Sequence, residues 1–312
     1  MADLAPTPVG LPEPGVPDEL VEFGVEAEGQ WRRVLRRFLR HKLAVASLII
    51  LLVLITASFL GRTVARYGFD EYSRGEESSP PSLRHWFGTD SLGKDTLAQV
   101  LRGARRSLLV ALVVAAISTT VGTLVGAVAG YYRGFVDLVL MRLTDLFLTI
   151  PALAVLLVAS SRFGGEGSNW IAISLVISSL AWMYLARLVR GVFLSLRERE
   201  FVEAARALGA SDARIVFRHL LPNALGPIVV NATLLVAAAI ATETALSYLG
   251  FGIAAPDTSL GKLVAEGVTA ASTRWWLFYM PGLWLVLISL CINFVGDGLR
   301  DAIDPRGTKV RA

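Results

Sequence analysis

The chain has 312 residues, of which 54% are apolar and only 18% are charged, and its mean hydropathy is +0.57. Soluble domains carry about 25% charged residues, so this composition argues against an ordinary cytosolic enzyme. The single cysteine, Cys291, excludes an intramolecular disulfide and a cysteine-based metal cluster. The three histidines lie far apart in the sequence, and no catalytic constellation of side chains is visible. We therefore expect no metal site, no cofactor and no catalytic residue in this chain.

Residues 1–30 form an acidic segment that holds five of the 13 prolines and seven acidic residues. Such a segment cannot bury enough apolar surface to offset the entropy of ordering, so we predict a disordered tail. A basic stretch follows, with Trp31, Leu35, Phe38 and Leu39 on one helical face and five arginines around it. Because this stretch leads directly into an apolar segment, we interpret it as the cytoplasmic flank of a membrane helix rather than as a nucleic-acid-binding helix.

Six apolar segments are long enough to cross the hydrocarbon core of a bilayer, which is about 30 Å thick. They cover residues 43–60, 107–130, 136–160, 169–189, 224–249 and 277–296. We expect an all-α membrane protein with six transmembrane helices, and Pro151 in the third segment predicts a kink or a break there. The expected regions are the tail 1–30, a first helix with a long extracytoplasmic loop (31–102), a five-helix core (103–297) and a cytoplasmic C-terminal tail (298–312).

The distribution of basic residues predicts which side of the membrane each loop faces. With the N-terminus inside, the inner segments hold 19 lysines and arginines and the outer segments hold 11. Cytoplasmic loops carry the excess of basic residues, and long loops count less in this rule. We therefore expect both termini in the cytoplasm.

Two glycine patterns need an interpretation. Gly122, Gly126 and Gly130 lie on one face of the second segment, where they let another helix approach closely. We interpret them as packing residues, with a flexible pore element as the alternative. Residues 88–95 (GTDSLGKD) nearly match the phosphate-binding loop of ATPases. We reject a nucleotide site because Asp95 replaces the magnesium-binding hydroxyl and because no buried strand precedes the motif.

The stretch between the fourth and fifth segments, residues 190–222, is too polar to cross the membrane but is well organised. A short helix is expected over 200–208, and Gly209 supplies its stop. Ser211 is expected to cap a second helix, which Pro222 ends before the membrane. The apolar face of the first helix consists of Phe201, Ala204, Ala205 and Leu208. Because neither helix has a core of its own to enter, this face needs the lipid surface or a groove on another protein.

This stretch resembles the EAA loop of ABC importer permeases. The resemblance rests on Glu203-Ala204-Ala205, on Gly209 and on Leu221-Pro222. Other segments resemble signatures of the dipeptide/oligopeptide/nickel subfamily of these permeases, namely residues 88–95, 103–108, 214–227, 243–252 and 296–306. They occur in the family's order over residues 32–307, so the chain looks like a C-type permease of this subfamily.

The resemblance implies a type I ABC importer permease fold and a place in a larger assembly. Such a permease forms half of a transmembrane pathway in the cytoplasmic membrane of a prokaryote. Its partners are a homologous second permease, two cytoplasmic ATPase subunits, which bind ATP and magnesium, and an extracytoplasmic substrate-binding protein. The ATPase-coupling residues implied are Glu203, Ala204, Ala205, Gly209, Leu221 and Pro222. The alternative for this loop is a helical hairpin that lies on the lipid surface.

Glu243 lies late in the fifth segment, close to its expected outer end. Carboxylates inside membrane segments are rare, and they are usually functional or paired. Two interpretations stay open. Glu243 is either a gate or substrate contact, or a structural residue that pairs with the second permease or caps the turn at 248–252.

Two further side-chain pairs carry structural expectations. Arg142 and Asp145 are three residues apart on the third segment, so we expect them to pair with each other near the inner interface. Trp275 and Trp276 precede the last segment, and we expect them to anchor it at the membrane interface.

The function expected is that of a permease subunit of an ATP-driven importer for peptides or related small solutes. Nickel chelates, glutathione and oligosaccharides stay open as substrates, because they pass through importers of the same subfamily. A self-contained secondary transporter would favour an inverted repeat, which we do not find, and a membrane enzyme would need convergent catalytic groups. The sequence does not identify the substrate, because the binding protein does most of the selecting in such systems.

Overall fold

A computed structural model describes residues 30–163 and 169–303, so the expected disordered tail lies outside the described residues except for its last residue. Within the described residues, strand geometry is limited to two isolated bridges in the loop that precedes α4. The helices are α1 (Gln30–Arg40), α2 (Lys42–Phe59), α3 (Gly61–Val64), α4 (Thr96–Tyr132), α5 (Gly134–Thr149), α6 (Ala152–Phe163), α7 (Trp170–Arg197), α8 (Glu200–Ala207), α9 (Asp212–Arg214), the π-helical turn η1 (Ile215–Leu220), α10 (Leu221–Tyr248), α11 (Leu260–Val268) and α12 (Trp276–Ile303).

Five helical stretches of the described chain are long and apolar enough to cross a membrane. They are α2, α4, α7, α12 and the continuous stretch Asp212–Tyr248. A sixth crossing would combine α5 and α6, which are bent by 84° at the break between them. Pro151 lies in that break, so the interruption predicted in the third segment is confirmed. Proline has no N–H to donate within a helix, and its ring clashes with the preceding turn.

Several helices extend beyond their predicted membrane segments, α4 and α12 among them. α4 begins at Thr96 rather than at residue 107, because the carboxylate of Asp95 caps it by accepting a hydrogen bond from the N–H of Ala98 (2.8 Å). With 37 residues it is about 55 Å long, far more than a bilayer core requires. α12 continues through the boundary predicted at residue 298 to Ile303. The first part of the predicted C-terminal tail is therefore helical.

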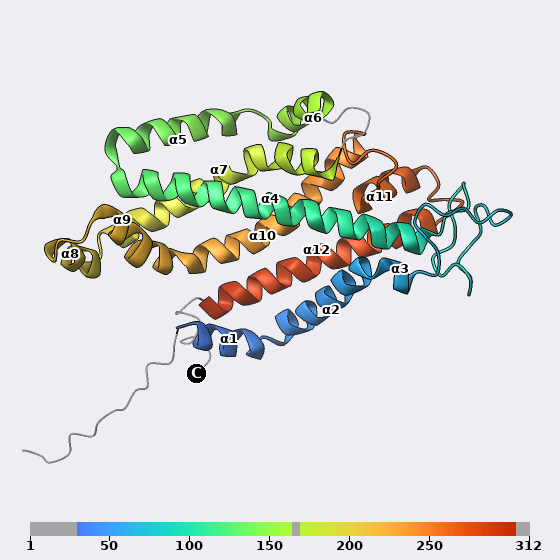
Figure 1. The fold of residues 1–312 in the computed structure, drawn as a ribbon, viewed down its shortest axis with the longest axis horizontal. Helices are drawn as coiled ribbons and strands as arrows, with labels where there is room; N and C mark the ends of the chain where they lie inside the picture. The colour runs from blue at the N-terminus through green and yellow to red at the C-terminus, as the bar shows by residue number, and fades with distance from the viewer. Residues whose placement is uncertain (1–29, 164–168, 304–312) are drawn as a thin grey trace, which may run out of the picture.

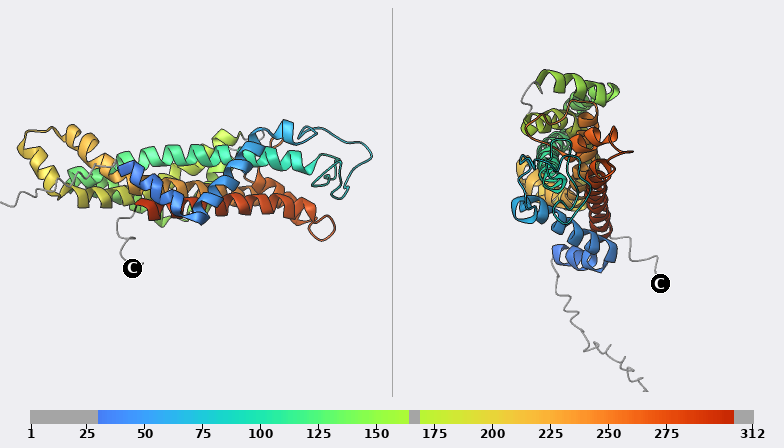
Figure 2. Two further views of the ribbon diagram at one scale, coloured as in Figure 1. Left: turned by 90° about the horizontal axis from the view of Figure 1, so that it is seen from below. Right: turned by 90° about the vertical axis from the view of Figure 1, so that its right-hand side faces the viewer.

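The bundle is elongated, and its two ends differ. The main apolar core lies between α4, α7, α10 and α12. α8 lies at one end of the bundle, and the loop that precedes α4 lies at the other (Figure 1). α1 and the last turns of α12 lie toward the α8 end, as the view from below also shows (Figure 2). Both ends of the described chain are thus on the same side as α8.

Helices α4 and α7 share the most extensive helix contact of the described chain, and three glycines allow it. Gly122, Gly126 and Gly130 all face α7. A Cβ on Gly126 would lie 2.4 Å from the carbonyl oxygen of Ala186, and a Cβ on Gly130 would lie 2.7 Å from the Cβ of Phe193. Side chains at these positions would force the two helices apart.

Candidate functional site

Residues 198–220 form a helical hairpin at one end of the bundle, here called the α8 hairpin. α8 ends at Ala207, and Gly209, two residues further on, has a φ of +77°, which is readily adopted only by glycine. The N–H of Ala210 donates to the carbonyl of Ala205 (3.0 Å), and the N–H of Gly209 donates to the carbonyl of Arg206 (2.9 Å). These two bonds form a Schellman motif, so the stop predicted at Gly209 is confirmed.

The second arm of the α8 hairpin does not end at Pro222, and that prediction was wrong. α9, η1 and α10 follow one another without a break. The N–H of Leu221 donates to the carbonyl of Val216, five residues back, so the helix is widened just before the proline. Pro222 follows this widened turn directly, within the continuous helix. Ser211 takes the N-cap position of α9, but its side chain makes no capping hydrogen bond.

The inner face of the α8 hairpin enters a core of the chain itself, contrary to expectation. Val202, Ile215 and Leu220 have no exposed surface, and they pack in one apolar cluster with Phe193 of α7. Ala205 belongs to the same cluster. The buried face of α8 is therefore formed by Val202 and Ala205. Of the predicted apolar face, Ala205 is buried, whereas Phe201, Ala204 and Leu208 are exposed.

The outer face of the α8 hairpin presents large apolar side chains to the surroundings. Leu208 is 88% exposed, Phe217 is 64% exposed and Phe201 is 40% exposed. Leu208 and Phe201 belong to the first arm of the hairpin, whereas Phe217 lines a groove against α4. Phe217 lies in the π-helical turn and was not among the residues predicted from the sequence.

The six residues implied by the EAA resemblance do not share one environment. Glu203, Ala204, Gly209 and Pro222 are exposed, Leu221 is partly buried and Ala205 is buried. Glu203, Ala204 and Gly209 are exposed close to Leu208 in the chain, whereas Pro222 lies in α10, outside the α8 hairpin. Ala205 instead packs inward, where it supports the position of α8.

Polar contacts attach the α8 hairpin to α4. The hydroxyl of Tyr131 donates to Asp212 (2.6 Å), at the start of the second arm. Arg197, at the end of α7, donates to the backbone carbonyl of Tyr131. Arg133 and Glu198 form an ion pair (2.6 Å) beside them. These contacts join the α8 hairpin directly to the ends of α4 and α7.

The carboxylates of α5 pair with α7 rather than within α5. Asp145 forms an ion pair with Arg187, and Asp137 binds Arg190 through both carboxylate oxygens. The predicted pair of Arg142 with Asp145 was wrong. Arg142 is exposed, whereas the arginines of α7 reach across to the neighbouring helix.

A cavity of about 380 Å³ adjoins the break between α5 and α6. Ile150 and Pro151 line it at the break, Tyr184 lines it from α7, and Thr242 lines it from α10. Most of its lining is apolar. Non-helical backbone at membrane depth is tolerated only where it is covered by protein or lines an aqueous cavity. The break and the cavity therefore belong together as one feature.

Glu243 lies inside the protein and has no exposed surface. Its carboxylate accepts hydrogen bonds from Ser247 (2.7 Å) and from Ser107 of α4 (3.1 Å). The hydroxyl of Ser259, the N-cap of α11, lies 3.3 Å from that of Ser247. These four residues, the serine–glutamate cluster, join α10 to α4 and α11.

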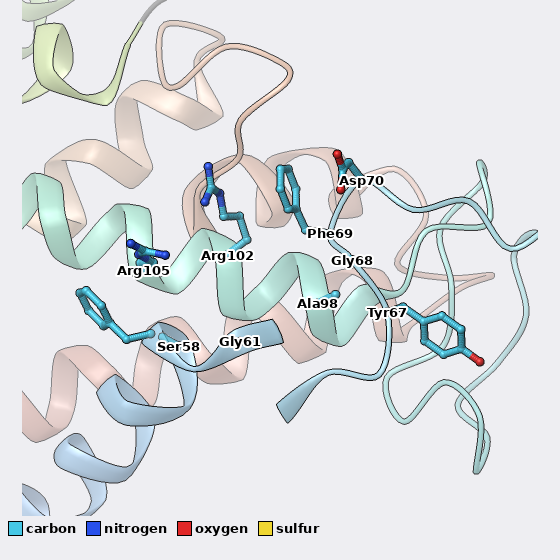
Figure 3. Close-up of a pocket in the computed structure, with 10 residues that line it drawn as sticks. Ser58, Gly61, Tyr67, Gly68, Phe69, Asp70, Ala98, Arg102 and Arg105 are labelled. Atoms are coloured by element: carbon cyan, nitrogen blue, oxygen red, sulfur yellow. The ribbon is translucent and has the colours of Figure 1, made fainter. Parts of the chain in front are cut away.

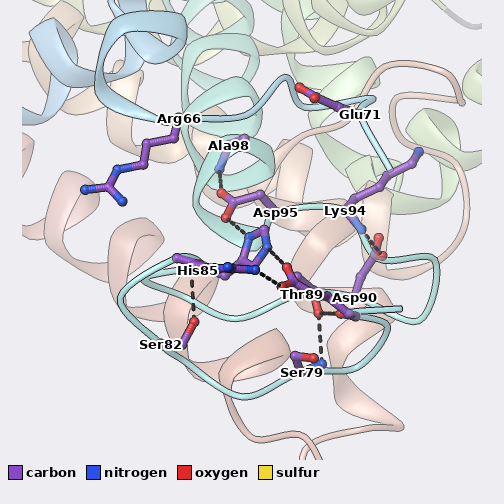
Figure 4. Close-up of polar contacts among 12 residues, drawn as sticks. Arg66, Glu71, Ser79, Ser82, His85, Thr89, Asp90, Lys94, Asp95 and Ala98 are labelled. Carbon is purple, nitrogen blue, oxygen red and sulfur yellow. Dashed lines mark hydrogen bonds and ion pairs between the residues drawn. The ribbon is translucent and has the colours of Figure 1, made fainter. Parts of the chain in front are cut away.

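The outer cap, residues 65–95, is organised around one buried histidine (Figure 4). His85 is 1% exposed, and its ring nitrogens contact Asp95 (2.7 Å) and Glu76 (2.6 Å). The ring of Tyr67 stacks on the imidazole, with the ring centroids 4.5 Å apart. The indole N–H of Trp276 donates to the backbone carbonyl of Thr89 (3.1 Å), which attaches the outer cap to α12. Trp276 is thus buried, and its predicted role as an interface anchor was wrong.

The glycine-rich segment of the outer cap has no phosphate cradle. One carboxylate oxygen of Asp90 accepts hydrogen bonds from the N–H groups of Leu92 (2.8 Å) and Lys94 (2.9 Å). The carboxylate of Asp95 contacts the ring of His85 through one oxygen and accepts the N–H of Ala98 at the start of α4 through the other. The donors that a nucleotide would need are therefore used within the loop.

Comparison with known proteins decides the family. A family model described as "Binding-protein-dependent transport system inner membrane component" matches residues 122–309. The chain belongs to this family. A second model, described as "N-terminal TM domain of oligopeptide transport permease C", matches residues 29–81. The resemblance seen in the sequence is confirmed, and the chain is a multi-pass transport component rather than an enzyme.

Individual relatives cover nearly the whole chain. The oligopeptide transport system permease protein OppC of Mycobacterium tuberculosis (strain H37Rv) is 44% identical over 278 residues, which are 89% of this chain and 95% of that protein. OppC of Escherichia coli K12 is 42% identical over 284 residues, 90% of this chain and 93% of that protein. A solved inward-facing structure of the MetNI methionine ABC transporter matches with a TM-score of 0.55 at 21% identity, over 66% of this chain and 96% of that chain. This likeness confirms the ABC importer permease fold.

Proposed function

We propose that this chain is one of two permease subunits of an ATP-driven importer for peptides or related small solutes. Its relatives at 42–44% identity carry the name of oligopeptide permeases, which supports the substrate class. The observation that carries the proposal is the α8 hairpin, with its inner face buried in α4 and α7 and with Leu208 exposed at its tip.

The α8 hairpin docks into a groove of a cytoplasmic ATPase subunit. Glu203, Ala204 and Gly209 form this contact together with Leu208, while Ala205 holds α8 against the permease. A hairpin attached in this way converts movement of the ATPase into a tilt of α4 and α7. Closure of the ATPases on ATP then shifts the population of the permease pair between its inward-facing and outward-facing states.

The cavity at the α5–α6 break forms this chain's side of the transmembrane pathway, and the second permease forms the other side. Interrupted membrane helices expose backbone groups at mid-membrane, and transporters use such groups to contact substrates. A peptide presents the same kind of backbone donors and acceptors whatever its sequence. Glu243 is assigned a structural role, because Ser247 of its own helix and Ser107 of α4 donate to its carboxylate and Ser259 of α11 lies beside Ser247.

The arrangement in the membrane follows from the same assignments. The α8 hairpin and both chain ends face the cytoplasm, as the excess of basic residues in the inner segments suggests. The outer cap then faces the extracytoplasmic binding protein. The complete transporter contains this chain, a homologous permease, two ATPase subunits that bind ATP and magnesium, and the binding protein, in the cytoplasmic membrane of a prokaryote.

Co-purification and uptake test the function together. The chain is expressed with its candidate partners, purified and reconstituted into proteoliposomes with the binding protein. We expect an ATPase subunit to co-purify and labelled peptide to accumulate only with internal ATP. Accumulation by this chain alone would assign it to self-contained carriers. Uptake of a nickel chelate or an oligosaccharide without peptide uptake would reject the peptide class.

A further inference from the structure

A cavity of about 360 Å³ lies where the end of α2 meets the first turns of α4 (Figure 3). It shares no lining residue with the cavity at the α5–α6 break. α4 contributes Arg102 and Arg105, one turn apart. The segment that follows α3 contributes Phe69 and Asp70, and the end of α2 contributes Phe59. The cavity thus combines two guanidinium groups, aromatic rings and one carboxylate.

The two arginines differ in what they bind. Arg102 donates to Asp257 (2.9 Å), and its guanidinium lies 4.7 Å from the ring centroid of Phe69. Arg105 has no hydrogen bond or ion pair with any described residue, and its Nε atom is buried. Its guanidinium lies 5.1 Å from the ring centroid of Phe59, which covers a face of the group but accepts none of its N–H donors. A buried N–H donor of a charged group costs free energy when no acceptor binds it. An anion bound to Arg105 would supply that acceptor.

The position of Arg105 relative to the membrane narrows the choice of anion. Phe59 is the last residue of α2, a membrane-crossing helix, so Arg105 lies where lipid headgroups begin. Leu112, two turns along α4 on the same face, is 53% exposed. The side of α2 away from the bundle is also apolar and exposed, through Ile49, Leu52 and Val53. An apolar surface therefore extends from the cavity toward the middle of the membrane.

We propose that this cavity binds the headgroup of a phospholipid, with the phosphate on Arg105 and the acyl chains along the exposed faces of α2 and α4. Guanidinium groups match phosphate geometry and can donate two parallel hydrogen bonds to it. Asp70 lines the same cavity and forms no ion pair with a described residue. A site with a cation and a carboxylate favours a zwitterionic headgroup, so phosphatidylethanolamine binds in preference to phosphatidylglycerol.

Native mass spectrometry of the full chain in detergent tests the site, with palmitoyl-oleoyl phosphatidylethanolamine and phosphatidylglycerol as probes. Wild type should hold one phosphatidylethanolamine at concentrations that leave phosphatidylglycerol mostly free. Arg105→Gln should weaken this binding at least about tenfold, because it removes the charge and the paired donors. Arg74→Gln, on an exposed arginine of the outer cap, is the matched control and should bind as wild type. Equal binding by Arg105→Gln and wild type, with unchanged thermal stability, would overturn the site.

Two further experiments test the charge of the headgroup and the contribution of the acyl chains separately. Asp70→Asn should reduce binding of phosphatidylethanolamine and leave that of phosphatidylglycerol unchanged or stronger. If Asp70→Asn leaves the lipid preference as it is, the zwitterionic assignment is wrong. Millimolar inorganic phosphate should not displace the lipid, because the acyl chains contribute to binding. Displacement by phosphate alone would show a site for a free anion instead of a phospholipid.

Discussion

Leu208 offers the sharpest test of the α8 hairpin. It is 88% exposed, so Leu208→Ala removes three carbon atoms that contribute little to the folding of the subunit itself. If an ATPase groove buries the side chain, the loss is about 0.8 kcal/mol per carbon, or about 2.4 kcal/mol in total. Since 1.4 kcal/mol is a factor of ten in Kd, we expect Leu208→Ala to weaken binding of the ATPase about 50-fold.

The assay is a titration of permease nanodiscs with the purified ATPase subunit, followed by peptide uptake with the same variants. Leu83→Ala is the matched control, because Leu83 is also 88% exposed but lies in the outer cap, and its Kd should equal that of wild type. Val202→Ala should instead lower the midpoint of thermal unfolding, because it opens a void in the buried inner face. A Kd for Leu208→Ala within about twofold of wild type would refute the docking argument.

Three further predictions concern stability. Gly126→Ala places a Cβ 2.4 Å from a carbonyl oxygen of α7 and should lower the midpoint of thermal unfolding in detergent, whereas Gly282→Ala meets nothing within 4 Å and should not. Ser107→Ala removes a donor from the serine–glutamate cluster and should cost about 1–3 kcal/mol, measured by unfolding in denaturant. The pKa of Glu76 is lowered by its hydrogen bond to His85, so its contribution is present above the unfolded-chain value of 4.5 and is lost as the pH falls through the folded value. The outer cap should resist proteolysis above pH 4.5 and less so below it, and Glu76→Gln should weaken this dependence. Unchanged melting of Gly126→Ala, unchanged stability of Ser107→Ala or a pH-independent digest would contradict the respective argument.

Features that depend on local sequence were predictable. The long apolar segments, the break at Pro151 and the stop at Gly209 each follow from properties of a few neighbouring residues. Membrane-crossing helices are especially easy to predict from sequence, because a helix must have a minimum length and a continuous run of apolar side chains to cross the bilayer. The family signatures added membership of the transport family, which the helix pattern alone does not identify.

Features that depend on distant residues were not predictable from local patterns. Val202 and Ala205 of α8 are buried because they pack in one cluster with Phe193 of α7. The spacing of apolar residues within α8 does not reveal this contact. Asp145 is three residues from Arg142 in the sequence, but it forms its ion pair with Arg187 of the adjacent helix. Trp276 was assigned to the lipid interface because nothing in its neighbourhood predicts that Thr89 accepts its N–H. In each case tertiary packing overrode the neighbour along the chain.

The central claim is that the α8 hairpin faces an ATPase while the outer cap faces the binding protein. Cys291 is buried, so a single new cysteine can be labelled selectively with a photoactivatable maleimide. In the assembled transporter, Leu208→Cys should crosslink to the ATPase subunit, and Leu83→Cys should crosslink to the binding protein. A crosslink from Leu208→Cys to the binding protein, or only to lipid, would contradict the account.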